Sequence, residues 1–340
     1  MAQATNYFPT QAIQMWYQQE AQVGVQPDEN DLLQAQLVSF TLPEASVPIE
    51  TSAQRAGKFT MQSNQVKHSQ GTKLWTFETV LRGTPKSLDL AFSGVMEDYA
   101  VNYVLNNTYE FPTDNYNVSA TSGGTVAGTF EIRFTGVGQH ATNNNMEING
   151  CVATSVTLTQ DIGAEAGEMV CTIQWATGFQ PIYTATAVTG GSPDYDVDVP
   201  VNIRQLSESN TTVDTKELVL KSWSLSINRT IERIHYADNT DASYKPFGYA
   251  MTGAFEVSGE LSVIRNTDIS VIANHFYDST PVAINIQADT ANDLTITLPI
   301  CYINEPTIDT GQSILHQVIP FVVYASDSSS ETAMVTVNCQ

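Results

Sequence analysis

Basic side chains are scarce in this sequence of 340 residues. It contains 14 lysines and arginines against 36 aspartates and glutamates, which gives a formal net charge of −22. Proteins that grip nucleic acids gain much of their affinity from lysines and arginines that displace counterions from phosphates. The charge therefore argues against a protein that holds DNA, while an acidic surface remains compatible with letting DNA pass without adsorption.

Paired cysteines and long apolar runs are also missing. The four cysteines, Cys151, Cys171, Cys301 and Cys339, show no CxxC spacing. The first twenty residues have neither the basic start nor the apolar run of a signal peptide. No stretch is apolar enough to cross a membrane as a helix. We therefore expect reduced thiols in a protein assembled in cytoplasm, with no membrane partner.

The sequence lacks motifs for catalysis, metal binding or cofactor binding. Gly136 and Gly138 mimic a dinucleotide-binding turn but lead into asparagines rather than a helix, which favours a β-turn. The acidic stretch 194–198 lacks the glycine and glutamate of a calcium loop and is interpreted as a solvated linker. The histidines lie far apart: His68, His140, His235, His275 and His316. We expect no enzyme activity and no cofactor.

The sequence is rich in β-forming residues, in an order that occurs twice. Each copy has a strand, a long polar stretch, a second strand, a helix and three further strands. The helices are predicted over 86–98 and 268–278, because apolar residues recur there on one helical face: Leu88, Ala91, Phe92, Val95 and Met96 in the first, Ile269, Ile272, Ala273 and Phe276 in the second. The strands before them, 75–81 and 255–263, alternate apolar and polar residues.

This order predicts a mainly β protein with two tandem β-sandwich domains, each flanked by one α-helix. The boundaries place an N-terminal arm at 1–31 and the first domain at 32–180, with a surface-loop insertion at 99–128. A linker follows at 181–214. The second domain, with a C-terminal tail, occupies 215–340.

The same features resemble those of siphophage-type bacteriophage tail tube proteins. The resemblance rests on Glu20 followed by Gly24, on the segments at Gly150-Cys151 and Leu298-Pro299, and on the strand–long loop–strand–helix order over about 18–326. It implies a structural subunit whose stacked rings conduct DNA through an acidic lumen. Expected partners are the protein itself, a tape measure protein and a tail terminator. The location would be the virion tail, after assembly in the host cytoplasm.

The resemblance assigns roles to two groups of charged residues. Polar faces of the strands before the helices should line the lumen, with Glu78, Glu256 and Glu260 on them. The long stretches 43–71 and 228–253 should bridge stacked rings through their basic residues: Arg55, Lys58, Lys67, Arg229, Arg233 and Lys245. Two tube domains per chain predict a ring of three chains, a pseudo-hexamer.

A different class of function stays open from the sequence alone. A β-sandwich binding module for carbohydrates or a receptor would expose aromatic side chains on a concave face. The candidates are Trp16, Tyr17, Tyr99, Tyr103, Tyr109 and Tyr116. An acidic β-enzyme is a third alternative, because paired carboxylates cannot be recognised by spacing in so acidic a chain.

Overall fold

The computed structural model is mainly β, as the composition predicts. It describes residues 13–20, 33–44, 49–51, 66–68, 73–96, 107–111, 117–119, 128–136, 139–140, 145–164, 167–184, 194–195, 200–202, 211–234, 248–253, 256–266, 269–289, 294–311, 313–325 and 334–339. Within these ranges, two helices accompany a set of antiparallel strands, most of which belong to one hydrogen-bonded network.

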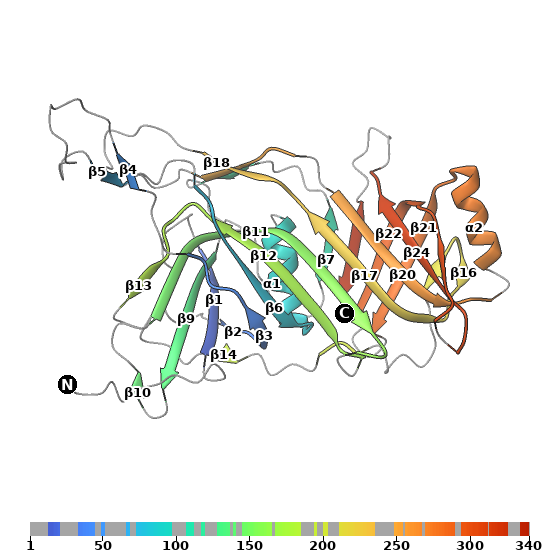
Figure 1. The fold of residues 1–340 in the computed structure, drawn as a ribbon, viewed down its shortest axis with the longest axis horizontal. Coiled ribbons are helices and arrows are strands. Elements are labelled where there is room, and N and C mark those ends of the chain that lie inside the picture. Colours follow the sequence, from blue (N-terminus) through green and yellow to red (C-terminus); the bar gives the residue numbers. More distant parts are fainter. Residues whose placement is uncertain are drawn as a thin grey trace.

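One antiparallel sheet runs through both halves of the chain (Figure 1). Its order is β3 (Leu37–Phe40), β6 (Trp75–Arg82), β12 (Met169–Thr177), β11 (Asn145–Asp161), β17 (Leu220–Asn228), β20 (Glu256–Ile264), β24 (His316–Val323) and β23 (Thr307–Asp309). The first four strands come from the first half of the chain and the last four from the second. We call this array the central sheet.

A second group of strands pairs with the long strands where these leave the central sheet. The start of β11 pairs with β9 (Gly128–Gly136) and β13 (Ile182–Thr184), and β9 pairs with β1 (Ile13–Gln19) and β10 (Gln139–His140). Strand β2 (Leu33–Gln34) joins β1 and β14 (Asp194–Tyr195). In the second half, β22 (Leu294–Ile303) pairs with β21 (Val282–Asp289), and β21 with β15 (Thr212–Val213), which continues into β16 (Lys216–Glu217).

Matching irregularities occur in the two halves of the central sheet. The register of β3 on β6 shifts between Leu37 and Ser39, and that of β17 on β20 shifts between Leu220 and Ser222. Cys151 of β11 pairs with Thr177, just as Cys301 of β22 pairs with Val323. Because a bulge re-aims every later side chain, its recurrence at one place keeps the same faces buried in both halves.

Each helix follows a central-sheet strand, where the apolar periodicity predicts it. Helix α1 (Pro85–Met96) begins with Thr84 as its cap. The Thr84 Oγ1 accepts from the Ser87 amide at 3.1 Å, and the Ser87 Oγ accepts from the Thr84 amide at 2.8 Å. Helix α2 (Ile269–Asp278) begins after Asn266, whose Oδ1 accepts from the Ile269 amide at 3.2 Å. Asp268, the first residue of the predicted helix, lies outside the described residues.

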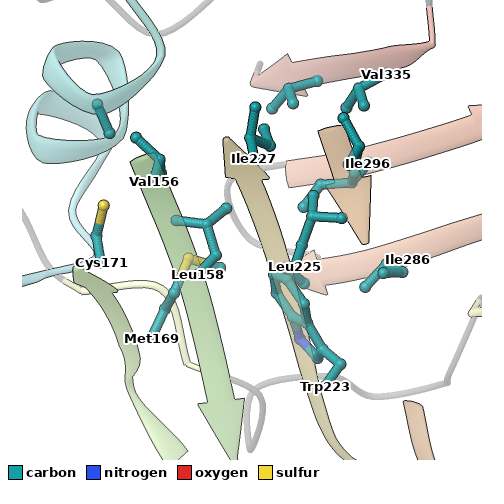
Figure 2. Close-up of a cluster of buried hydrophobic side chains, with 14 of the residues drawn as sticks. Val156, Leu158, Met169, Cys171, Trp223, Leu225, Ile227, Ile286, Ile296 and Val335 are labelled. Atoms are coloured by element: carbon teal, nitrogen blue, oxygen red, sulfur yellow. The ribbon is translucent and has the colours of Figure 1, made fainter. Parts of the chain in front are cut away.

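The core is continuous across the two halves. Buried side chains of β11 and β12, in the first half, lie beside those of β17, in the second half. Those of β17 in turn lie beside the other buried side chains of the second half (Figure 2). Among them, Val156, Leu158, Leu225 and Ile227 have no exposed surface. Burying such side chains contributes about 1.5–3 kcal/mol each. The junction between the halves is therefore packed as a domain interior.

Segments expected to be an arm, a loop and a linker contribute strands. From the 1–31 segment, β1 pairs along its whole length with β9. The 99–128 insertion supplies β7 (Asn107–Phe111), which pairs with β25 (Val335–Cys339), and β8 (Asn117–Ser119), which pairs with β19 (Gly248–Met251). Strand β25 also pairs with β22. These pairings join residues far apart in sequence, so local composition did not reveal them.

Two hairpins arise from the long polar stretches. In 43–71, β4 (Ile49–Thr51) pairs with β5 (Val66–His68); in 228–253, β18 (Ile231–Ile234) pairs with β19. Figure 1 places the first near one end of the molecule and the second over the middle of the central sheet.

Candidate functional site

The β11–β17 pairing joins the two halves through a regular ladder. Seven residue pairs run from Ser155↔Asn228 to Asp161↔Ser222. Leu158 faces Leu225 within it, and both are fully buried. Polar side chains reinforce the ladder: the Trp223 Nε1 donates to the Gln160 Oε1 at 2.8 Å. The joint is therefore an antiparallel pairing with an apolar inner face.

The two ends of the central sheet carry the counterparts of this joint. Within the described residues, β3 pairs only with β6, and β23 only with β24. Leu42 follows Leu37 by the interval that separates Leu225 from Leu220. Ile308 follows Cys301 by the interval that separates Leu158 from Cys151. Leu42 is 41% exposed and Ile308 is 49% exposed. The two side chains that correspond to the buried pair of the joint are thus open to solvent.

The predicted lumen glutamates lie on one polar face of the central sheet. Residues directly opposite each other in a ladder share a face, and one row of opposed residues contains Glu78, Gln174, Ser155, Asn228 and Glu256. A second row contains Arg82, Val170, Thr159, Ser224, Glu260 and Pro320. The Gln174 Nε2 donates to the Glu78 carboxylate. Glu256 and Glu260 are exposed, whereas Glu78 is half-buried.

Hydroxyl and small polar groups dominate the rest of this face. Between the glutamates lie Thr172, Thr157, Ser226 and Ser258, in a row that β6 begins with Val80. The Thr157 and Ser226 hydroxyls are 3.0 Å apart across the joint. Among the residues of these rows, Arg82 is the basic one. Its Nε lies 3.7 Å from a Glu168 carboxylate oxygen. The face therefore offers little free positive charge to a phosphate.

The predicted ring-bridging cations fall into different environments. Arg229 and Arg233 are 4% and 5% exposed, so they are buried within the subunit. The Arg229 Nε donates to the Ala153 carbonyl at 2.8 Å, and burial lowers the pKa of Arg233. Lys67 belongs to β5. Arg55, Lys58 and Lys245 lie outside the described residues.

Tyr249 forms a contact between the two halves that sequence reasoning did not find. It comes from β19 and is 1% exposed. Its hydroxyl accepts from the Gly178 amide at 2.8 Å and donates to the Gly150 carbonyl at 2.6 Å. Its ring packs in a cluster with Val152, Leu74, Phe179 and Ile231, and burial raises its pKa. The alternation of Phe247 and Tyr249 with small residues was the available signal.

Two of the aromatic residues proposed for a binding module are buried. Trp16 and Tyr17 are 2% and 1% exposed and belong to the interior. Tyr109 is part of β7, and Tyr99, Tyr103 and Tyr116 lie outside the described residues. Across the described ranges, no helix is long and apolar enough to span a membrane. No group of three or more potential metal ligands gathers there either.

Comparison with known proteins decides between the classes of function. The sequence pattern of a phage tail tube protein family matches residues 11–323. The chain belongs to the phage tail tube protein family. This tail tube protein is accordingly a structural component of the virion tail that assembles with itself into a tube, and the binding-module alternative is not favoured. No curated protein matches the chain.

Proposed function

We propose that three chains of this tail tube protein close one ring, and that each chain fills two of six similar positions around the axis. The β11–β17 joint carries the proposal. It connects two halves with the same strand order, the same bulge and the same helix position. A joint of this kind between chains would repeat the one inside the chain.

The free ends of the central sheet are complementary under this proposal. Applying the internal register to the ends places β23 of one chain beside β3 of the next, with Ile308 opposite Leu42. Burial of these two exposed aliphatic side chains would contribute about 1–3 kcal/mol for each joint. Closure also removes the free edges, which otherwise favour uncontrolled pairing.

The polar face of the central sheet is proposed to line the lumen. Its glutamates and hydroxyl groups would face passing DNA without the phosphate contacts that give affinity. Glu78, Glu256 and Glu260 support this orientation because they share one face, opposite the core. The whole lumen would then be continuous from chain to chain.

Ring stacking is proposed to use the long polar stretches 43–71 and 228–253. Because Arg229 and Arg233 are buried within the subunit, the proposal rests on the cations outside the described residues, Arg55, Lys58 and Lys245. Stacked acidic rings repel each other, and cations that meet acidic neighbours would offset this repulsion. A tape measure protein inside the tube and a terminator at its end are further proposed partners.

A disulfide between chains tests both the register and the number of chains. We expect the double variant Leu42→Cys with Ile308→Cys, in a Cys339→Ser background, to form disulfides between chains on oxidation. Directly opposed residues of antiparallel strands lie within disulfide reach. The remaining native thiols, Cys151, Cys171 and Cys301, are buried. The largest covalent species on a non-reducing gel should be a trimer.

Matched variants make the result specific. Each single cysteine variant should give no covalent trimer, and neither should Glu44→Cys with Ile308→Cys, which is shifted by two positions along the strand. A ladder that ends at six chains would replace the proposed stoichiometry with a hexamer of chains. Efficient crosslinking of the shifted pair would refute the register.

A further inference from the structure

An open pocket of about 660 Å³ lies on the second half of the chain. It is lined by Pro281, Ile300, Tyr302, Tyr324 and Ala325. Tyr302 and Tyr324 are 38% and 51% exposed, and their rings meet edge to face at 5.4 Å between centroids. Adjacent exposed tyrosines are typical anchors of a protein interface.

The first half of the chain shows what occupies the corresponding place. Ile300 and Tyr302 flank Cys301 as Gly150 and Val152 flank Cys151. Tyr324 and Ala325 follow Val323, the partner of Cys301, as Gly178 and Phe179 follow Thr177, the partner of Cys151. In the first half these positions are the ones that Tyr249 covers, through Val152, Phe179 and the two hydrogen bonds to Gly150 and Gly178.

The covering element also has a counterpart. Tyr249 belongs to the β18–β19 hairpin, where it pairs with Arg233. In the β4–β5 hairpin, Glu50 pairs with Lys67. Glu50 lies as many residues after Leu37 as Arg233 lies after Leu220. Lys67 lies as many residues before Leu81 as Tyr249 lies before Val263. Leu37 pairs with Leu81, and Leu220 with Val263. The two hairpins therefore occupy equivalent places in the two halves.

The β4–β5 hairpin of the same chain is not on this pocket. Figure 1 shows β4 and β5 at one end of the molecule and β22 and β24, which carry the pocket, toward the other. We propose that the pocket between Tyr302 and Tyr324 receives the β4–β5 hairpin of a second copy of this chain. The proposal rests on the ring described above, in which β3 of one chain lies beside β23 of another.

The chemistry of the two surfaces is compatible. At the position of Tyr249 in β19, β5 has Lys67. Where the first half has Val152 and Gly178, the second half has the rings of Tyr302 and Tyr324. An ammonium group over an aromatic ring is a favourable contact. Under this proposal the pocket is open in a single chain because the hairpin that covers it belongs to another copy.

Photocrosslinking identifies the occupant. A photoreactive p-benzoylphenylalanine replaces Tyr302 in chains assembled from an equal mixture of ¹⁴N- and ¹⁵N-labelled protein. After irradiation of isolated rings, we expect mass spectrometry to find crosslinks from position 302 to residues 49–68, about half of them joining a light to a heavy chain. The same probe at Tyr277, which is 78% exposed on α2, is the control and should not reach residues 49–68.

A second measurement uses truncation. Tyr302→Ala with Tyr324→Ala should raise the protein concentration needed for half-maximal ring formation about tenfold or more, as loss of aromatic anchors does at interfaces. Tyr277→Ala should leave that concentration unchanged. Folding of each variant is checked by the unchanged circular dichroism of the subunit.

The outcomes separate this inference from the ring itself. A Leu42–Ile308 disulfide without crosslinks to residues 49–68 would overturn the hairpin docking and leave the ring standing. Crosslinks that never join a light chain to a heavy chain would show docking within one chain and would also overturn the proposed docking between copies. Hairpin crosslinks without the disulfide support the docking and refute the proposed strand register, and absence of both refutes both.

Discussion

Removal of the Tyr249 hydroxyl tests how the β18–β19 hairpin is held on the first half of the chain. In Tyr249→Phe, the Gly178 amide loses its acceptor and the Gly150 carbonyl loses its donor, while the ring remains. A buried N–H without a partner costs about 1–3 kcal/mol, and a lost hydrogen bond to a carbonyl about 1 kcal/mol. The expected loss is therefore about 2–4 kcal/mol of local stability.

Hydrogen exchange at the Gly178 amide measures this loss directly. Because each 1.4 kcal/mol corresponds to a tenfold change in an opening equilibrium, exchange at Gly178 should be about 30-fold faster or more in Tyr249→Phe. Amides in α2 should exchange at an unchanged rate. Tyr277→Phe, at an exposed position, serves as the matched control. An unchanged rate at Gly178 would refute the assignment of the hydroxyl as its anchor.

The same variant changes the response to alkaline pH. Burial raises the pKa of Tyr249 well above that of a free phenol. Below about pH 10 the phenol is neutral in both the folded and the unfolded chain, so it adds no pH dependence there. Above that pH only the unfolded chain ionises it, and folding stability should fall by up to about 1.4 kcal/mol per pH unit. Tyr249→Phe should lack this part of the loss.

Two further predictions concern the central sheet and its polar face. In Gly259→Ala, the new Cβ would lie 2.4 Å from the Phe321 ring and from a backbone oxygen of β17. The free energy of unfolding should therefore fall by about 1–3 kcal/mol, which lowers the midpoint of urea unfolding. An unchanged midpoint would contradict this close packing. Tubes of Glu78→Lys with Glu260→Lys should retain short duplex DNA in a sedimentation assay and release it as salt is added, because the lumen would gain phosphate contacts. Equal retention by a Glu217→Lys control would refute the proposed lumen face.

The sequence predicted the regular elements well, because their signals are local. The apolar stripe of α1 and the alternation along β6 and β20 each depend on neighbouring residues only. The same two-residue period places each of the three glutamates on the polar face of its own strand. The mainly β fold class was thereby confirmed.

Non-local pairings were beyond local patterns. Strand β7 was expected to be surface loop, since its pairing with β25 depends on residues more than two hundred positions away. Arg229 and Arg233 were counted as loop charges, because charge can be read from residue type but burial cannot. Tyr249 was missed for the same reason: its partners, Gly150 and Gly178, are backbone groups of the other half.

The β11–β17 joint has a consequence for the kinetics of assembly. In the proposed ring, this joint forms when each chain folds, at the high effective concentration of tethered partners. Only the joints between chains then depend on diffusion. The initial rate of ring formation should therefore rise with about the third power of protein concentration or less, rather than with the sixth power expected of single-domain subunits that associate in one step. A dilute pool of subunits would still close rings, and translational entropy would be lost by three bodies instead of six.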